Sequence, residues 1–330
     1  MNDDLPPSCP RVAAPGSEPP PPRRWRPLAA LLLAGGTLAL LLTHSQPSSP
    51  LATSLANPFQ WLGAPLKLAD RLASRMVPVG SVEERQLGDL YRQRFEAGLD
   101  PADPRQAYLD ALMATIRRHA RRPFPYRAYR IGAQGMPNAY ALPGGVIVVS
   151  DELLTSLGSE AQLVAVLAHE VGHIELGHCF DTVRFQLLAR RSGVTSLGQL
   201  ADLANRLLLR HNFSKAEEHE ADSYAFRLLL HSPYDPSALA DSFASLQRQQ
   251  ARAGAGGAAR EQNADLLGDY LRSHAPLPLR QAEFSQEAAA WWQRHPTARR
   301  YQGRRNLRRH QPLSRLPLAE EWRRGPSAPR

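Results

Sequence analysis

The residues from Ser159 to Phe180, SEAQLVAVLAHEVGHIELGHCF, organise the rest of the chain. This stretch contains no proline and repeats its apolar side chains at helical spacing, which predicts a helix. His169 and His173 are four positions apart and therefore share one face of that helix. Two imidazoles at this spacing can bind one metal ion, and the neighbouring Glu170 can take a proton from a water molecule that the metal activates. A buried helix with two hydrogen-bonded histidines is the alternative, because His-Glu-x-x-His also occurs by chance.

A metal held by two histidines needs a third protein ligand, and the end of the same helix is the first place to look. One class of zinc protease extends the motif to His-Glu-x-x-His-x-x-Gly-x-x-His. Here Leu176 stands at the glycine position and Cys179 at the position of the last histidine, while Gly177 and His178 are one residue out of register. His178 is therefore not expected to be a ligand, and Cys179 is one candidate.

A second helix offers the other candidate ligand. The segment from Ser214 to Leu230, SKAEEHEADSYAFRLLL, places Glu218 and Asp222 four positions apart on one face. Glu218 can bind the metal while Asp222 accepts a hydrogen bond from a ligand histidine, which fixes the tautomer of that histidine. A solvated acidic helix face is the alternative, but the histidine motif upstream favours the metal site.

Other short blocks accompany these two helices along the chain. They are Asn138 to Ile147 (NAYALPGGVI), Glu218 to Asp222 (EHEAD), Tyr234 to Pro236 (YDP), and His274 followed by Arg280. With the histidine motif, they resemble the M48-type gluzincin zinc peptidases over roughly residues 80–290. That family includes CAAX prenyl endopeptidases, membrane heat-shock peptidases, and quality-control peptidases of bacterial envelopes and the mitochondrial inner membrane. The single-span members of the last group are closest in layout.

The resemblance implies an α+β fold that is mainly helical. It implies a gluzincin-type zinc peptidase domain with a small β-sheet beside the zinc helix, to which the sequence adds one N-terminal transmembrane helix. The expected cofactor is one Zn²⁺ per chain. Its ligands are expected to be His169, His173 and Glu218, with Glu170 as the general base and Asp222 as the hydrogen-bond partner of a ligand histidine.

The resemblance also implies residues that act on the substrate. His274 is expected to donate a hydrogen bond to the oxyanion, or to occupy the fourth zinc position in a resting form. Arg280 is expected to position the substrate or to brace the loop. The segment from Asn138 to Gly145 is expected to form a strand edge that pairs with the substrate backbone, although an ordinary hairpin with a glycine turn is the alternative. The residues assigned to this edge are Asn138, Ala139, Gly144 and Gly145.

Residues 81–290 are predicted to form the metallopeptidase domain. Further helices are predicted at 81–97, 104–121 and 236–252, and strands at 126–131 and 146–150. Ser81 and Glu84 have the spacing of a capping box at the start of the first helix. The linker 181–210 between the two metal helices suits either a lid or a packed insertion.

The N-terminal region is predicted to hold a membrane anchor. Residues 1–26 are rich in proline and are predicted to be a disordered cytoplasmic tail. Pro27–Thr43, PLAALLLAGGTLALLLT, has no charge and is at the short limit of the about 17–25 residues that span a bilayer. Three arginines precede it, which predicts a single-pass inner-membrane protein of a bacterium with a periplasmic catalytic domain. A cleaved signal peptide is the rival interpretation, and residues 44–80 are predicted to be a linker and a juxtamembrane helix.

The charge balance of the 330-residue chain is basic, with 40 Lys and Arg against 31 Asp and Glu. Much of the excess lies in residues 291–330, a predicted basic C-terminal tail that we expect to contact anionic lipid headgroups. No nucleic-acid motif is present, so nucleic acid is not an expected partner. Cys9 and Cys179 lie on opposite sides of the predicted span, so a disulfide between them is not expected.

Together these features predict a membrane-anchored zinc endopeptidase that cleaves misfolded or unassembled envelope proteins. A chaperone-like binding module on the same fold is one alternative. The presence of Glu170 argues against it, because a module that only binds needs no base beside the metal. A prenyl-protein peptidase is another alternative, but those members of the family cross the membrane several times and this chain has one apolar span.

Overall fold

The computed structural model describes residues 81–133, 137–183, 213–254, 274 and 277–325. All of them belong to one compact unit, Pro78–Arg330. The predicted tail, membrane span and juxtamembrane helix, together with residues 184–210 of the predicted linker, lie outside the described residues. Within the part that the structure describes, no helix has the length and apolar character needed to cross a bilayer.

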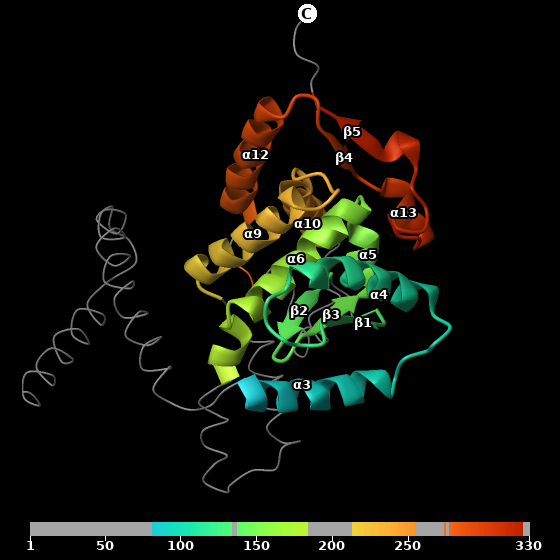
Figure 1. The fold of residues 1–330 in the computed structure, drawn as a ribbon, viewed down its shortest axis with the longest axis vertical. Coiled ribbons are helices and arrows are strands. Elements are labelled where there is room, and N and C mark those ends of the chain that lie inside the picture. Colours follow the sequence, from blue (N-terminus) through green and yellow to red (C-terminus); the bar gives the residue numbers. More distant parts are fainter. Residues whose placement is uncertain (1–80, 134–136, 184–212, 255–273, 275–276, 326–330) are drawn as a thin grey trace, which may run out of the picture. The chain divides into compact units, whose positions relative to one another are not determined.

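A three-stranded sheet forms one layer of the domain (Figure 1). Its strands are β1 (Arg127–Ile131), β2 (Ala139–Leu142) and β3 (Val146–Ser150), in the order β1-β3-β2. The central strand β3 is parallel to β1 and antiparallel to β2, so β2 forms one edge of the sheet. Every residue of β3 is buried, which explains its continuous run of β-branched side chains. The predicted small sheet is therefore present.

The histidine motif lies on α6 (Glu160–Glu175), the central helix of the domain. Its residues are buried from Glu160 to Ile174, because the sheet packs on one side and α9 (Lys215–Leu230) on the other (Figure 1). The prediction of one helix up to Phe180 was too long. Gly177 has a φ of 84°, a left-handed conformation that interrupts the helix before helical structure resumes at residues 178–183.

Two helices precede the sheet, α3 (Ser81–Glu96) and α4 (Pro104–Ile116). The α4 helix begins at Asp103, whose side chain accepts a hydrogen bond from the backbone N–H of Arg105. The capping box predicted for Ser81 and Glu84 stays a prediction, because the side chain of Ser81 lies outside the described residues. The Glu84 carboxylate is buried and paired with the guanidinium of Arg122, so it ties α3 to the segment that leads into β1.

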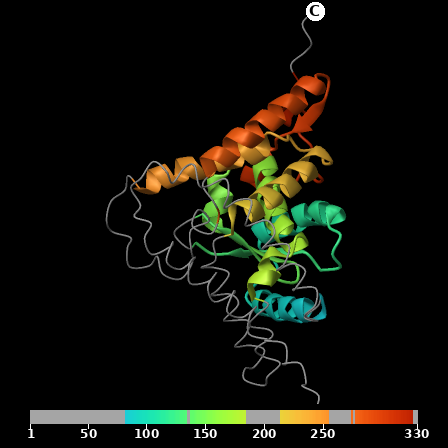
Figure 2. The same ribbon diagram turned by 90° about the vertical axis from the view of Figure 1, so that its left-hand side faces the viewer.

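The C-terminal part continues the folded domain beyond residue 290, although a tail was expected from residue 291. It contains α10 (Ala238–Gly254), α12 (Leu277–Arg294), β4 (Arg299–Tyr301), α13 (Arg304–Arg309), a 3-10 turn (Ala319–Glu321) and β5 (Trp322–Arg324). Figure 2 shows α12 extended beside the β4–β5 pair. Tyr301 and Leu307 are buried, and these apolar anchors fix an otherwise arginine-rich segment to the domain up to Gly325.

This C-terminal segment completes the first turn of α6. The backbone N–H of Glu160 donates to the carbonyl of Gly303 at 3.0 Å, and that of Ala161 donates to Gln302 at 3.0 Å. The buried Glu160 carboxylate accepts hydrogen bonds from Tyr234 at 2.7 Å and from the backbone N–H of Leu313 at 2.9 Å. The N–H groups that a helix start leaves without partners are therefore satisfied here from the far end of the chain.

Candidate active site

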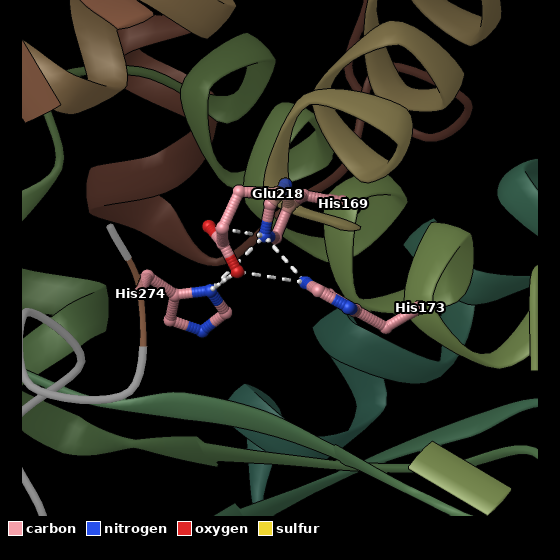
Figure 3. A group of neighbouring side chains, drawn as sticks. All are labelled: His169, His173, Glu218 and His274. Atoms are coloured by element: carbon pink, nitrogen blue, oxygen red, sulfur yellow. Dashed lines mark hydrogen bonds and ion pairs between the residues drawn. The ribbon is translucent and has the colours of Figure 1, made fainter. Parts of the chain in front are cut away.

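Four buried side chains converge beside the sheet. His169 and His173 come from α6, Glu218 from α9, and His274 from the segment before α12 (Figure 3). One potential ligand atom from each lies within 4.8 Å of the others. Nε2 of His173 is 3.0 Å from Nε2 of His169, and Nδ1 of His274 is 2.8 Å from Oε1 of Glu218. Three imidazoles and one carboxylate at these separations form a donor set that suits zinc.

The close approach of α6 and α9 brings Glu218 to the histidines. Gly172 faces α9, and a Cβ at this position would lie 3.1 Å from the carbonyl oxygen of Ala221 and 3.1 Å from Cβ of Tyr224. Any larger residue would therefore press the two helices apart. The α9 helix starts in a fixed register, because Ser214 and Glu217 form a reciprocal capping box immediately before Glu218.

The two histidines of α6 each have a partner for the ring nitrogen that faces away from the group of four. Nδ1 of His169 lies 2.8 Å from Oδ1 of Asp222. Nδ1 of His173 lies 3.0 Å from Nδ1 of His178, and the ring of Phe213 stacks on His173 with centroids 4.0 Å apart. Both Nε2 atoms are thereby directed toward Glu218, the orientation that a shared metal ion requires.

Burial sets the charge of these groups. It lowers the pKa of His169 and, more strongly, that of His173, so both imidazoles are neutral at physiological pH and keep a lone pair for a metal. Burial alone would raise the pKa of Glu218, but His274 and His173 outweigh it and the pKa is lowered. Two neutral imidazoles and an ionised carboxylate are the protonation states that bind a divalent cation.

Glu170 lies beside this group but outside it. It is fully buried, and within the described part of the chain neither of its carboxylate oxygens makes a hydrogen bond. Nε2 of His274 lies 3.7 Å from Oε1 of Glu170. Burial raises the pKa of Glu170 to about 8, an effect that His274 and the nearby backbone N–H of Ala141 partly offset. A buried carboxylate whose oxygens are not occupied by a side-chain donor among the described residues fits a site that a metal and a water molecule would complete.

Comparison with known proteins supports the same interpretation. Residues 103–303 match the model of Peptidase family M48. The chain belongs to peptidase family M48. It is 33% identical over 141 residues to the mitochondrial metalloendopeptidase OMA1 of Arabidopsis thaliana, an alignment that covers 42% of this chain and 26% of that protein.

Two bacterial relatives of this M48 chain come from Escherichia coli. The metalloprotease LoiP is 32% identical over 122 residues, covering 34% of this chain and 48% of LoiP. The beta-barrel assembly-enhancing protease is 26% identical over 198 residues, covering 52% of this chain and 40% of that protein. The matched region thus spans less than half the length of each of these three relatives.

Arg280 contacts the group of four through Glu218 and also contacts Asp222, the partner of His169. Its Nε and Nη2 lie 2.6 and 2.7 Å from the two oxygens of Asp222, and its Nη1 lies 2.7 Å from Oε2 of Glu218. The guanidinium also lies over the ring of Phe243, 4.6 Å from the centroid. Of the two roles expected for Arg280, this geometry favours bracing the site over touching a substrate.

The predicted strand edge separates into two parts. Asn138 and Ala139 lie at the start of β2, where the backbone N–H of Asn138 donates to Oγ of Ser150 at 2.9 Å. Gly144 and Gly145 have φ values of 80° and 93° and form the turn at the other end of the strand. A Cβ on Gly144 would come within 2.7 Å of Glu84 and Gly88, so this glycine serves the packing of the turn against α3.

Cys179 does not take the ligand role considered for it, and two residues near the histidines were not predicted to contact them. Cys179 is buried, but it is not a member of the group of four among the described residues. Sequence reasoning missed the contact of His178 with His173 and the stacking of Phe213. The signal for the first was present, because a histidine follows His173 by five residues, just past a glycine that can turn the chain.

Proposed function

We propose that this M48 chain is a zinc-dependent endopeptidase. The observation that carries the proposal is the buried group of His169, His173, Glu218 and His274, with Glu170 beside it. In this proposal His169, His173 and Glu218 hold one Zn²⁺. When bound, zinc supplies Lewis-acid chemistry, since it lowers the pKa of a water molecule from about 15.7 towards roughly 7 and polarises a peptide carbonyl.

Glu170 is proposed to transfer the proton. Its carboxylate accepts a proton from the attacking water and later gives it to the leaving amine. Burial raises the pKa of Glu170, and a higher pKa makes its carboxylate a stronger proton acceptor. No side-chain donor among the described residues occupies its oxygens, which leaves the carboxylate available for that water.

His274 is proposed to stabilise the oxyanion. Its Nε2 lies on the side of Glu170, at 3.7 Å, and its Nδ1 lies 2.8 Å from Glu218. The carboxylate of Glu218 raises the pKa of His274 against the opposing effect of burial, which favours an imidazole that donates hydrogen bonds. The same position also suits the alternative of a fourth ligand in a resting form, with His274 moving aside when substrate enters.

The substrate is proposed to be an extended protein segment that adds to the edge strand β2. The backbone N–H of Ala141, on this strand, is close enough to Glu170 to lower its pKa. A peptide paired with β2 would therefore run past the proposed general base. In this arrangement Asn138 and Ala139 lie at the edge and contact the substrate backbone, and Gly144 and Gly145 shape the adjoining turn.

The cellular setting is part of the proposal. The uncharged run Pro27–Thr43 after three arginines supports a single-pass anchor in a bacterial inner membrane, with the domain in the periplasm. One relative is named a beta-barrel assembly-enhancing protease, which supports misfolded or unassembled envelope proteins as substrates. The arginines around α13 are proposed to contact anionic lipid headgroups.

A charge-neutral substitution tests the enzymatic proposal. The full chain is purified as wild type, as Glu170→Gln and as the surface control Glu287→Gln, and each sample is assayed for zinc content and for cleavage of an unfolded protein. We expect one zinc in each sample and a loss of about 10²–10⁴-fold in kcat for Glu170→Gln alone. Zinc without cleavage in the wild type would favour a binding module, and a wild type without zinc would refute the metal site.

A further inference from the structure

His173 has a second imidazole as its partner outside the group of four. Its Nδ1 lies 3.0 Å from Nδ1 of His178, and Nε2 of His178 lies 3.1 Å from Oε2 of Glu220. His178 is 3% exposed and Glu220 is 39% exposed. The three side chains therefore form a continuous row that runs from the buried group to the surface, between the residues after α6 and the first turns of α9.

Only one direction of hydrogen bonding along this row leaves His173 able to bind a metal ion. If His173 donates from Nδ1, its Nε2 keeps a lone pair that points at the group of four. His178 then accepts at Nδ1, carries its own proton on Nε2 and donates it to Glu220. The reverse direction would place the proton of His173 on Nε2, 3.0 Å from Nε2 of His169, where it would exclude a metal ion.

We propose that His178 and Glu220 are positioning residues that fix the tautomer and ring orientation of His173 for zinc. The inference rests on the proposed zinc site and adds to it residues that are not ligands. Asp222 provides His169 with a partner for its Nδ1 directly. For His173 the corresponding partner is the neutral imidazole of His178, which in turn is held by the carboxylate of Glu220. Phe213, stacked on His173, holds the ring plane in which this hydrogen bond can form.

Zinc affinity tests the proposal independently of activity. The full chain is titrated with zinc against a competing chelator as wild type, His178→Ala, His178→Asn and the control His219→Ala. We expect His178→Ala to weaken zinc binding about 10–100-fold, as the loss of such outer partners typically does. His178→Asn should recover most of the affinity, because its side-chain oxygen can accept where Nδ1 does. His219, which lies on α9 beside Glu220 but is 54% exposed, should have no effect.

The tautomers give a second readout, which needs no substitution. In zinc-loaded wild type labelled with ¹⁵N-histidine, NMR should find the proton of His173 on Nδ1 and that of His178 on Nε2. A proton on Nδ1 of His178 would overturn the inference, and so would equal zinc affinity of wild type and His178→Ala. A wild-type chain that binds no zinc would instead refute the proposed function, so the two failures are distinguishable.

Discussion

Replacing Arg280 with methionine should destabilise the whole domain, because this residue holds two buried carboxylates together. Its guanidinium makes three contacts of 2.6–2.7 Å with Asp222 and Glu218, whose side chains are 0% and 1% exposed. Methionine preserves the length of the side chain and its packing over Phe243. The substitution therefore removes chiefly the positive charge and leaves both carboxylates in the interior.

The expected cost follows from that burial. Removing one partner of a buried ion pair costs about 3–5 kcal/mol, whereas an exposed pair contributes about 0–1 kcal/mol. Against a typical free energy of unfolding of about 5–15 kcal/mol, this is a large part of the total. With a urea dependence of about 3 kcal/mol per molar, the unfolding midpoint should fall by roughly 1–1.7 M.

Urea unfolding followed by circular dichroism measures this change, since urea is uncharged and does not screen ion pairs. Arg305→Met is the matched control, because Arg305 pairs with Glu320 while both side chains are about half exposed, at 41% and 55%. The control should unfold within about 1 kcal/mol of wild type. If Arg280→Met unfolds at the same urea concentration as the control, the reasoning is refuted. A raised KM with unchanged stability would instead assign Arg280 to the substrate.

Two further predictions concern the frame around α6. Gly172→Ala should keep the fold but move α9 by a few tenths of an ångström, since its Cβ would lie 3.1 Å from the carbonyl oxygen of Ala221. Zinc affinity should then fall about tenfold. An unchanged affinity in a chelator titration would contradict this prediction. Burial raises the pKa of Glu160 above 4.5, so its favourable contribution to folding is fully present below pH 4.5 and is lost as the pH rises. Compared with wild type, Glu160→Gln should therefore become relatively more stable between pH 4.5 and 7 in chemical unfolding, and a difference that does not change with pH would count against the argument.

Much of the site could be predicted because helices fix the spacing of side chains. The positions of His169 and His173, and of Glu218 and Asp222, follow from four-residue intervals on two helices. The M48 assignment is confirmed by the family match, and the mainly helical domain with a small sheet is confirmed by the structure. The membrane span stays a prediction.

The remaining features depend on contacts between distant parts of the chain, which local patterns do not encode. The pairing of Arg280 with Asp222 joins residues 58 positions apart, and that of Arg122 with Glu84 joins residues 38 apart. Composition also misled the interpretation of residues 291–325. Their many arginines indicated a basic tail outside the folded domain, whereas a few buried side chains, Tyr301 among them, are enough to fold the segment onto the domain.

The way α6 begins has a consequence for the order in which the protein is made. The N–H groups of Glu160 and Ala161 find their acceptors at Gly303 and Gln302, so the helix start is completed only after those residues leave the ribosome. At about 5–20 residues per second, the interval between Glu160 and Gly303 lasts roughly 7–30 s. Contacts between such distant residues also form late in folding, because a long loop must close first. The histidine motif is therefore synthesised well before the residues that complete the start of its helix. The central helix of the proposed peptidase thus reaches its final hydrogen bonding late in synthesis.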